Sequence, residues 1–119
     1  MIGTSRLGVG VIGFGFMGRT HARAWLAAGA QGLSVELRAV TGAPGTDPPA
    51  GAALCPSAVE LLARDDVDAV SICTYTDTHV ELALAALRMG KHVLVEKPVA
   101  LRHEDVARLA AAEREAGLI

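Results

Sequence analysis

The sequence predicts an α/β fold in which helices flank a doubly wound sheet of parallel strands. Short apolar segments alternate along the chain with segments of helical periodicity, which is typical of parallel strands joined by right-handed crossovers. The chain has 119 residues, of which 51% are hydrophobic, so it can bury the core of one domain. We therefore predict one domain over residues 1–119.

The first half of the chain alternates strand, helix and strand. Residues 7–12 are an apolar run bounded by glycines, which indicates a strand buried on both faces. A helical pattern follows over residues 17–30, with Met17, His21, Ala24 and Ala28 along one side. Residues 35–40 are a second predicted strand. Residues 42–56 hold four prolines and three glycines, so we expect a loop there and no helix.

The second half continues the alternation. Residues 57–60 and 78–81 have the S/T-x-x-E spacing of a capping box, which predicts helices that reach Arg64 and Met89. Gly90 follows the second of these helices at the position where a left-handed residue ends a helix. Apolar patterns predict the remaining elements, which are strands at 69–73 and 92–95 and a last helix over about 102–116.

Leu118 and Ile119 follow the stop at Gly117 and resemble the start of another strand. We therefore expect the chain to be the front part of a longer architecture, truncated before a second domain. An unfinished sheet has an unpaired edge, so we expect a homo-oligomer or self-association.

Charge and composition exclude several classes of partner. The formal net charge is −2 and only four residues are aromatic, so neither DNA nor RNA is an expected partner. The longest apolar run, residues 7–18, is too short to span a membrane. It loosely resembles a signal peptide that ends near Ala22-Arg23-Ala24, but its glycines favour a loop, and we expect a cytoplasmic protein. Cys55 and Cys73 lack metal or redox spacing, so we expect free thiols and no metal site.

A glycine-rich motif follows the first predicted strand and opens the first predicted helix. Residues 13–18 read G-x-G-x-x-G and comprise Gly13, Phe14, Gly15, Phe16, Met17 and Gly18. In this context the first glycine permits a tight turn, the second admits a pyrophosphate, and the third packs helix against strand. Backbone N–H groups at the helix start favour the phosphate charge. The motif predicts a dinucleotide site; a glycine-rich turn without a ligand is the alternative.

The tip of the second strand bears on the choice of cofactor. NAD enzymes usually carry an acid there that binds the ribose, whereas this strand ends Ala39-Val40-Thr41-Gly42. Without a carboxylate, a 2′-phosphate is not repelled, and Thr41 can donate a hydrogen bond to it. Arg19 is the nearest cation, although it can equally be a solvated helix residue. We expect NAD or NADP as cofactor and favour NADP.

Glu96-Lys97-Pro98 follows the fourth predicted strand. At the carboxyl end of a parallel strand, these side chains border the crevice where ligands of open α/β sheets bind. An ammonium group beside a nicotinamide can hold a substrate hydroxyl and stabilise developing charge. The alternative is a surface turn with a salt-bridged lysine.

Three segments together resemble the amino-terminal domain of the Gfo/Idh/MocA oxidoreductases. They are GVGVIGFGFMGRTHARAW, VDAVSICTYTDTHVELALAAL and GKHVLVEKPVAL, and the resemblance covers residues 6–119. It implies a Rossmann-type domain of an enzyme that transfers a hydride between NAD(P) and a sugar, inositol, related polyol or carbonyl compound.

The resemblance also implies roles for individual residues. Thr74 and His79 match the segment that lines the nicotinamide, although His79 can instead be a helix-capping or packing residue. Glu96 matches the residue near the nicotinamide ribose, and Lys97 matches the catalytic lysine. Tyr75 stands where the family usually has proline, and this can reshape the nicotinamide edge.

The family's second domain has no counterpart in the chain, so we expect residues 1–119 to bind cofactor without turnover. Two alternatives remain at the level of the sequence. One is a nucleotide-binding module or pseudoenzyme, which binds a dinucleotide but performs no chemistry. The other is a class I methyltransferase, although such enzymes generally have an acid at the second strand's tip and no use for Glu-Lys-Pro.

Overall fold

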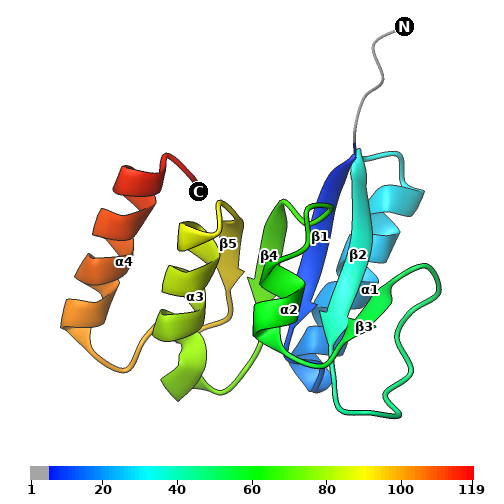
Figure 1. Cartoon of the computed structure of the whole chain (residues 1–119), viewed down its shortest axis with the longest axis horizontal. Helices are drawn as coiled ribbons and strands as arrows, with labels where there is room; N and C mark the ends of the chain where they lie inside the picture. The colour runs from blue at the N-terminus through cyan, green and yellow to red at the C-terminus, as the bar shows by residue number, and fades with distance from the viewer. Residues whose placement is uncertain (1–5) are drawn as a thin grey trace, which may run out of the picture.

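The computed structural model describes residues 6–119, and residues 1–5 of the predicted domain lie outside the described residues. Five parallel strands form one sheet in the order β3-β2-β1-β4-β5, which confirms the predicted doubly wound α/β fold (Figure 1). The strands are β1 (Leu7–Ile12), β2 (Val35–Thr41), β3 (Ala53–Cys55), β4 (Ala69–Ile72) and β5 (His92–Val95). The helices are α1 (Phe16–Ala30), α2 (Ala58–Leu62), the short 3-10 helix η1 (Thr76–Thr78), α3 (His79–Arg88) and α4 (His103–Ala116).

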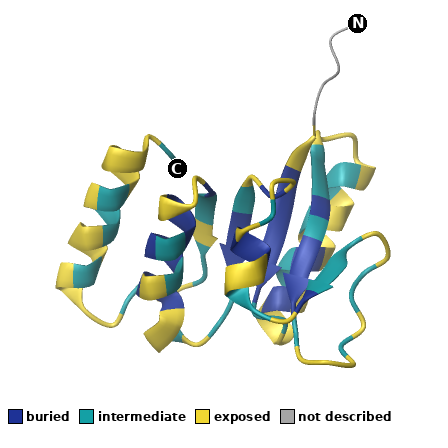
Figure 2. Ribbon diagram, viewed as in Figure 1, coloured by how far each residue is buried: buried dark blue, intermediate teal, exposed yellow. Residues whose placement is uncertain are grey.

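The helices form layers on both sides of the sheet. In Figure 1, α1 lies behind the sheet, α2 and α3 lie in front of it, and α4 lies beside α3. The central strands are the most buried part of the molecule (Figure 2), and their apolar side chains are at most 2% exposed at Val9, Val11, Val40, Val70 and Ile72. This burial on both faces explains why the central strand β1 has a continuous apolar sequence rather than an alternating one.

Helix α1 packs against the sheet through its small residues and Trp25. Gly18 and Ala22 are its buried residues, and Trp25 reaches across to β4, where its Nε1–H donates to Ser71 Oγ over 2.9 Å. Met17, His21, Ala24 and Ala28 share one side of the helix, as predicted, and line a shallow hollow beside Leu94 of β5. Small residues on the buried stripe let α1 approach the strands closely, and hydrophobicity alone does not signal such a contact.

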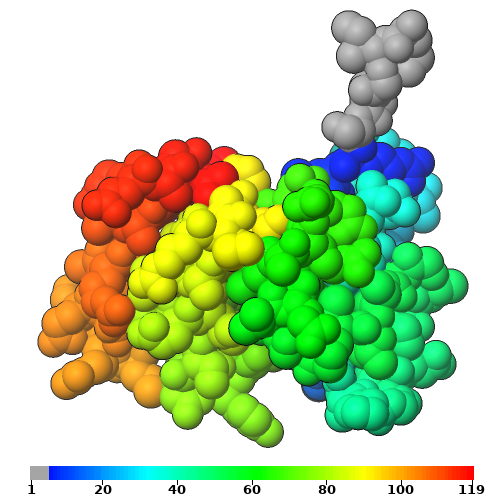
Figure 3. All heavy atoms as spheres, viewed as in Figure 1, coloured from blue at the N-terminus to red at the C-terminus, as the bar shows by residue number. Residues whose placement is uncertain are grey.

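The predicted loop over residues 42–56 contains a strand that the sequence did not indicate. Ala53, Leu54 and Cys55 form β3, which pairs in parallel with Ala39–Thr41 of β2. Three residues are too few to show a periodicity, so only the pairing with β2 identifies them as a strand. Residues 42–52 connect β2 to β3 without a helix, as predicted. They form the teal bulge at the lower right of Figure 3.

One of the two predicted capping boxes is confirmed as an N-cap and the other is wrong. Ser57 Oγ accepts a hydrogen bond from the backbone N–H of Glu60 over 3.2 Å and starts α2. Thr78 provides no such cap, because its hydroxyl lies 2.6 Å from Thr74 Oγ1 and donates over 2.7 Å to the Tyr75 carbonyl. The 3-10 turn that precedes α3 directs the Thr78 side chain back into the turn after β4. Helix α2 also ends at Leu62, earlier than predicted.

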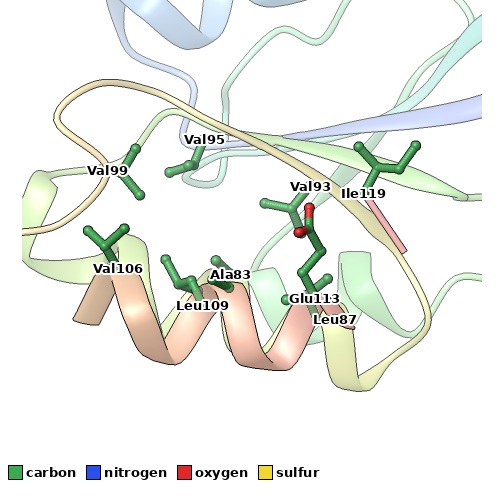
Figure 4. A pocket seen from close by; sticks show the side chains of 10 residues that line it. Ala83, Leu87, Val93, Val95, Val99, Val106, Leu109, Glu113 and Ile119 are labelled. Carbon is green, nitrogen blue, oxygen red and sulfur yellow. The ribbon is translucent and has the colours of Figure 1, made fainter. Parts of the chain in front are cut away.

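The last residues lie beside β5 without forming a strand. The Ile119 carbonyl accepts from Val93 N–H over 2.8 Å, and Ile119 N–H donates to His92 Nδ1 over 3.1 Å. Ile119 thereby closes one end of an apolar groove between α3, β5 and α4, into which Val93, Val95 and Leu109 point (Figure 4). The strand-like start predicted at Leu118 is therefore a single backbone contact.

Within residues 6–119, no helix combines the length and apolar character needed to cross a bilayer.

Candidate functional site

Four chain segments meet at the carboxyl end of the parallel sheet, which is the lower edge in Figure 1. They are the β1–α1 turn (residues 13–15), the β2–β3 segment (42–52), the β4–α3 turn (73–78) and the β5–α4 turn (96–102). All predicted site residues belong to these segments or to the element ends beside them. In doubly wound sheets, ligands bind at this edge, close to the strand at which the order reverses. Here that strand is β1.

The β1–α1 turn has almost no spare space around two of its glycines. Gly13 has a φ of +92°, and a Cβ built on it would lie 2.8 Å from the Cys73 carbonyl oxygen. A Cβ on Gly18 would lie 1.8 Å from the Gly13 carbonyl oxygen, so α1 rests directly on the turn. These two glycines therefore have the predicted turn and packing roles, which any larger residue would disrupt.

Gly15 differs from its two neighbours because its surroundings are open. No heavy atom lies within 4 Å of a Cβ built there, and Gly15 is the N-cap of α1 without any side-chain cap. The first intrahelical bond runs from Arg19 N–H to the Gly15 carbonyl over 3.0 Å. The N–H groups of Phe16, Met17 and Gly18 precede that bond and remain without intrahelical acceptors. The result is an open helix start that favours a negative charge.

Thr41 lies beneath the glycine turn rather than at an open strand tip. Its hydroxyl accepts from Gly13 N–H over 2.8 Å, and the residue is 9% exposed. The hydroxyl still has its own proton to donate. Thr41 thus holds the turn in place, a role that sequence reasoning did not assign to it.

Cationic side chains lie between the glycine turn and the β2–β3 segment. The Arg19 guanidinium carbon lies 4.7 Å from the centroid of the Phe14 ring, within the range of a cation–π contact. Arg19, Arg23, Phe14 and Asp47 line a hollow between α1 and residues 48–50. The hollow therefore contains two cations and one carboxylate.

The β4–α3 turn exposes one aromatic ring and buries one histidine. Tyr75 is 86% exposed, whereas His79 is 1% exposed. His79 Nδ1 lies 2.8 Å from the Pro98 carbonyl oxygen, and its Nε2 lies 3.0 Å from the Thr74 carbonyl oxygen. Both ring nitrogens of His79 are therefore engaged by the protein's own backbone.

The β5–α4 turn carries Glu96, Lys97 and Pro98, and the Lys97–Pro98 peptide bond is cis. Glu96 N–H donates to the Ile72 carbonyl over 2.9 Å, which continues the pairing of β5 with β4. The Glu96 Oε2 atom lies 3.2 Å from His21 Nε2 on α1. Lys97 is exposed at the sheet edge. The motif is therefore connected to both helical layers.

The contact between His21 and Glu96 joins residues 75 positions apart. His21 belongs to a segment that carries the family resemblance, but the sequence did not indicate this contact. A polar residue within the otherwise apolar stripe of Met17, Ala24 and Ala28 was the available signal, but a stripe does not identify the partner.

Cys73 lies at the end of β4, behind the glycine turn. Partial burial, and secondarily the negative charge of Glu96, raise the pKa of its thiol to about 11. The thiol therefore stays protonated at neutral pH and is a poor nucleophile. Both cysteines are free, as expected. No group of three or more His, Cys, Asp or Glu suited to a metal occurs among residues 6–119.

Comparison with known proteins yields a consistent set of relatives. The sequence profile of a family described as "Oxidoreductase family, NAD-binding Rossmann fold" matches residues 7–119. Inositol 2-dehydrogenase 3 from Saccharopolyspora erythraea is 37% identical over 111 residues, which are 92% of this chain and 33% of that protein.

Solved structures agree with the sequence comparison. GenD2 from gentamicin A biosynthesis, solved in complex with NAD, is 35% identical and superposes with a TM-score of 0.83 over 98% of this chain and 34% of its own. UDP-N-acetylglucosamine 3-dehydrogenase GnnA from Acidithiobacillus ferrooxidans is 34% identical, with a TM-score of 0.80 over 96% of this chain and 37% of its own. The chain thus spans about a third of the length of these relatives.

Proposed function

The chain belongs to the Gfo/Idh/MocA oxidoreductase family, and we propose that residues 1–119 are the dinucleotide-binding domain of a nicotinamide-dependent enzyme. Its substrate is a sugar, an inositol or a related polyol or carbonyl compound. Inositol and nucleotide-sugar dehydrogenases among the relatives support this substrate class.

The observation that carries the proposal is the contrast between Gly15 and the two glycines around it. Gly13 and Gly18 are enclosed by backbone, whereas the space around Gly15 is open in front of the N–H groups of α1. A pyrophosphate fits this space, because the helix start supplies N–H donors and a favourable dipole, and no side chain obstructs the approach.

The β4–α3 and β5–α4 turns are proposed to bind the nicotinamide half. A bound nicotinamide accepts or supplies the hydride. Thr74 and the exposed Tyr75 border its ring, and Glu96 accepts from hydroxyls of the adjoining ribose. Lys97 is exposed beside them, and its ammonium group holds the substrate hydroxyl and stabilises negative charge on that oxygen. His79 contributes to this half through the backbone that its ring contacts, because the ring itself is buried.

NADPH is proposed to bind at least as well as NADH. The absence of an acid at the end of β2 supports this, as does the position of Arg19 and Arg23 in the hollow beside residues 48–50. The Thr41 hydroxyl supports it less, since it is mostly buried and already accepts from Gly13. Arg19→Ala should weaken NADPH binding while NADH binding stays nearly unchanged.

Titration of the 119-residue chain with NADH and NADPH, followed by nicotinamide fluorescence, tests the proposal. We expect saturable binding of both and its loss in Gly15→Val, whose side chain fills the space proposed for the pyrophosphate. The variant should stay folded by circular dichroism, because nothing lies within 4 Å of the new Cβ. Unchanged affinity in Gly15→Val, or no binding by the wild-type chain, would contradict the proposal.

The role of Lys97 is tested in a protein that also contains a family-type second domain. There, Lys97→Ala should lower kcat by about 10²–10⁴-fold, the range typical of a lost acid–base group. Residues 1–119 alone should show no turnover of a polyol, since catalysis requires every reacting group in place. Full activity of the Lys97→Ala enzyme would reduce the motif to a structural turn.

A further inference from the structure

Two histidines hold the two residues that flank Lys97. His21 Nε2 on α1 lies 3.2 Å from the carboxylate of Glu96, and His79 Nδ1 on α3 lies 2.8 Å from the carbonyl oxygen of Pro98. Helices α1 and α3 lie on opposite faces of the sheet (Figure 1), so the turn is held from both sides. Lys97 is exposed between these two attachment points.

The His79 ring also joins two turns. Its second nitrogen, Nε2, lies 3.0 Å from the Thr74 carbonyl oxygen, so one side chain bridges the β4–α3 and β5–α4 turns. Carbonyl oxygens only accept hydrogen bonds, so the ring acts as the donor. A neutral imidazole has one N–H and can donate to one of the two oxygens, whereas an imidazolium donates to both. With 1% of the residue exposed, water cannot readily replace either partner.

The His21–Glu96 contact holds a carboxylate that is otherwise attached through its backbone alone. Glu96 N–H donates to Ile72, which fixes the residue at the end of β5 but leaves its side-chain torsions free. His21 orients the carboxylate, and the two side chains are only 15% and 25% exposed. A hydrogen bond to an ionised group in such partial burial is stronger than a neutral one.

We propose that His21 and His79 are positioning residues that preorganise the turn from Glu96 to Pro98 for the nicotinamide half of the dinucleotide. The inference rests on the proposed function. Without the two contacts, the turn would have to be ordered when the ligand binds, and that loss of entropy would weaken binding of the nicotinamide half alone. The proposed pyrophosphate site is the β1–α1 turn, a different segment from the turn that these histidines contact, so we expect binding there not to depend on them.

The test compares two ligands, NADH and ADP, by calorimetry on the 119-residue chain. ADP lacks the nicotinamide and its ribose, so it reports on the glycine turn without the turn that carries Lys97. Two variants remove a contact: His21→Leu removes the donor to Glu96, and His79→Gln places its amide nitrogen near the Nε2 position, away from Pro98. Two further variants restore the donor with an amide nitrogen. His21→Gln places it near the former Nε2 position, facing Glu96, and His79→Asn places it near the former Nδ1 position, facing Pro98. The exposed His103→Ala is the matched control.

We expect His21→Leu and His79→Gln to bind NADH about tenfold more weakly while ADP affinity changes less than about twofold. The restoring variants should recover most of the loss, and His103→Ala should match the wild type. If the histidines had only a structural role, the ratio of NADH affinity to ADP affinity would be the same in the variants as in the wild type. Such a result across all folded variants would overturn the proposal. If neither His79 variant folds, the comparison of His21→Leu with His21→Gln tests the proposal. If the wild-type chain binds neither ligand, the proposed function fails; if it binds both and the ratio never changes, only the positioning role fails.

Discussion

The β1–α1 turn and the β2–β3 segment lie at the same edge of the sheet, yet they are held in opposite ways. The turn is enclosed by backbone on two sides, and Thr41 fixes it from below through Gly13 N–H. Residues 42–52 are held largely by their own short-range bonds, such as Thr46 N–H to Ala43 and Ala52 N–H to Pro49, each 3.0 Å long. Gly45 and Gly51 have positive φ but open surroundings.

The difference shows where this fold needs a fixed backbone. A pyrophosphate site depends on the position of a few N–H groups, so the turn that provides them is supported by tertiary contacts at Gly13 and Gly18 and by the Thr41 hydroxyl. The β2–β3 segment provides no such donors, and its turns are satisfied locally. We therefore expect substitutions at the two enclosed glycines, Gly13 and Gly18, to affect the whole domain and substitutions in the segment to have local effects.

The largest effect is expected for Gly18→Ala. Its Cβ would lie 1.8 Å from the Gly13 carbonyl oxygen, and neither α1 nor the turn can move away without losing its packing. We expect the free energy of unfolding to fall by about 3 kcal/mol or more in urea denaturation. Gly15→Ala is the control three residues away and should change it by less than about 1 kcal/mol. Equal free energies of unfolding for the two variants would show that the close packing at Gly18 does not matter for stability.

The next effect concerns the thiol behind the turn. Because the pKa of Cys73 is raised to about 11, its thiolate population at pH 8 should be about a hundredfold lower than that of an ordinary thiol. In a Cys55→Ala variant, alkylation by iodoacetamide at pH 8, followed by mass spectrometry, should be slower by about this factor than in urea. The alkylation rate should rise with pH until about pH 11. Rapid labelling of the folded chain at pH 8 would show that the turn is open to solvent.

The raised pKa of Cys73 also makes the stability of the fold depend on pH. The folded state favours the protonated thiol, so the free energy of unfolding should fall as the pH rises from about 9 toward 11.

A smaller effect is expected where the turn meets β2. Thr41→Val removes the acceptor of Gly13 N–H and leaves that donor unsatisfied, which should lower the free energy of unfolding by about 1–3 kcal/mol. Thr41→Ser retains the hydroxyl and should retain most of the stability. If the valine variant is as stable as the serine variant, the turn does not depend on this hydrogen bond.

The smallest effect is expected in the β2–β3 segment. Pro49→Ala keeps the carbonyl that accepts from Ala52 and should change the free energy of unfolding by about 0.5 kcal/mol or less. NADH affinity should also stay within about twofold of the wild type. A large loss of either would show that this segment supports the site as firmly as the glycine turn does.

Most of the fold could be predicted from the sequence because its elements have strong local signals. The strands β1, β4 and β5 are short, mostly apolar segments, β2 alternates apolar and charged residues in its first half, and Gly90 and Gly117 both have positive φ where helices were expected to end. The exceptions are β3, which is too short to have a period, and the start of α3, where the Thr78 hydroxyl turns back toward Thr74 and Tyr75. In both cases a contact outside the expected element decided the local structure.

The sequence by itself determined the class of the fold, the position of the glycine turn and the set of residues at the sheet edge, because periodicity and spacing are properties of neighbouring residues. Only the tertiary structure decided which of those residues are exposed at the edge and which are buried against other parts of the chain. Thr41 is mostly buried and accepts from Gly13 N–H, and the ring of His79, for which packing was the alternative role, is buried with both nitrogens near backbone carbonyls. His21 has a partner in Glu96 that the sequence did not indicate. The physical reason is that these contacts join residues 28, 19 and 75 positions apart, and their partners become adjacent only when the sheet has formed.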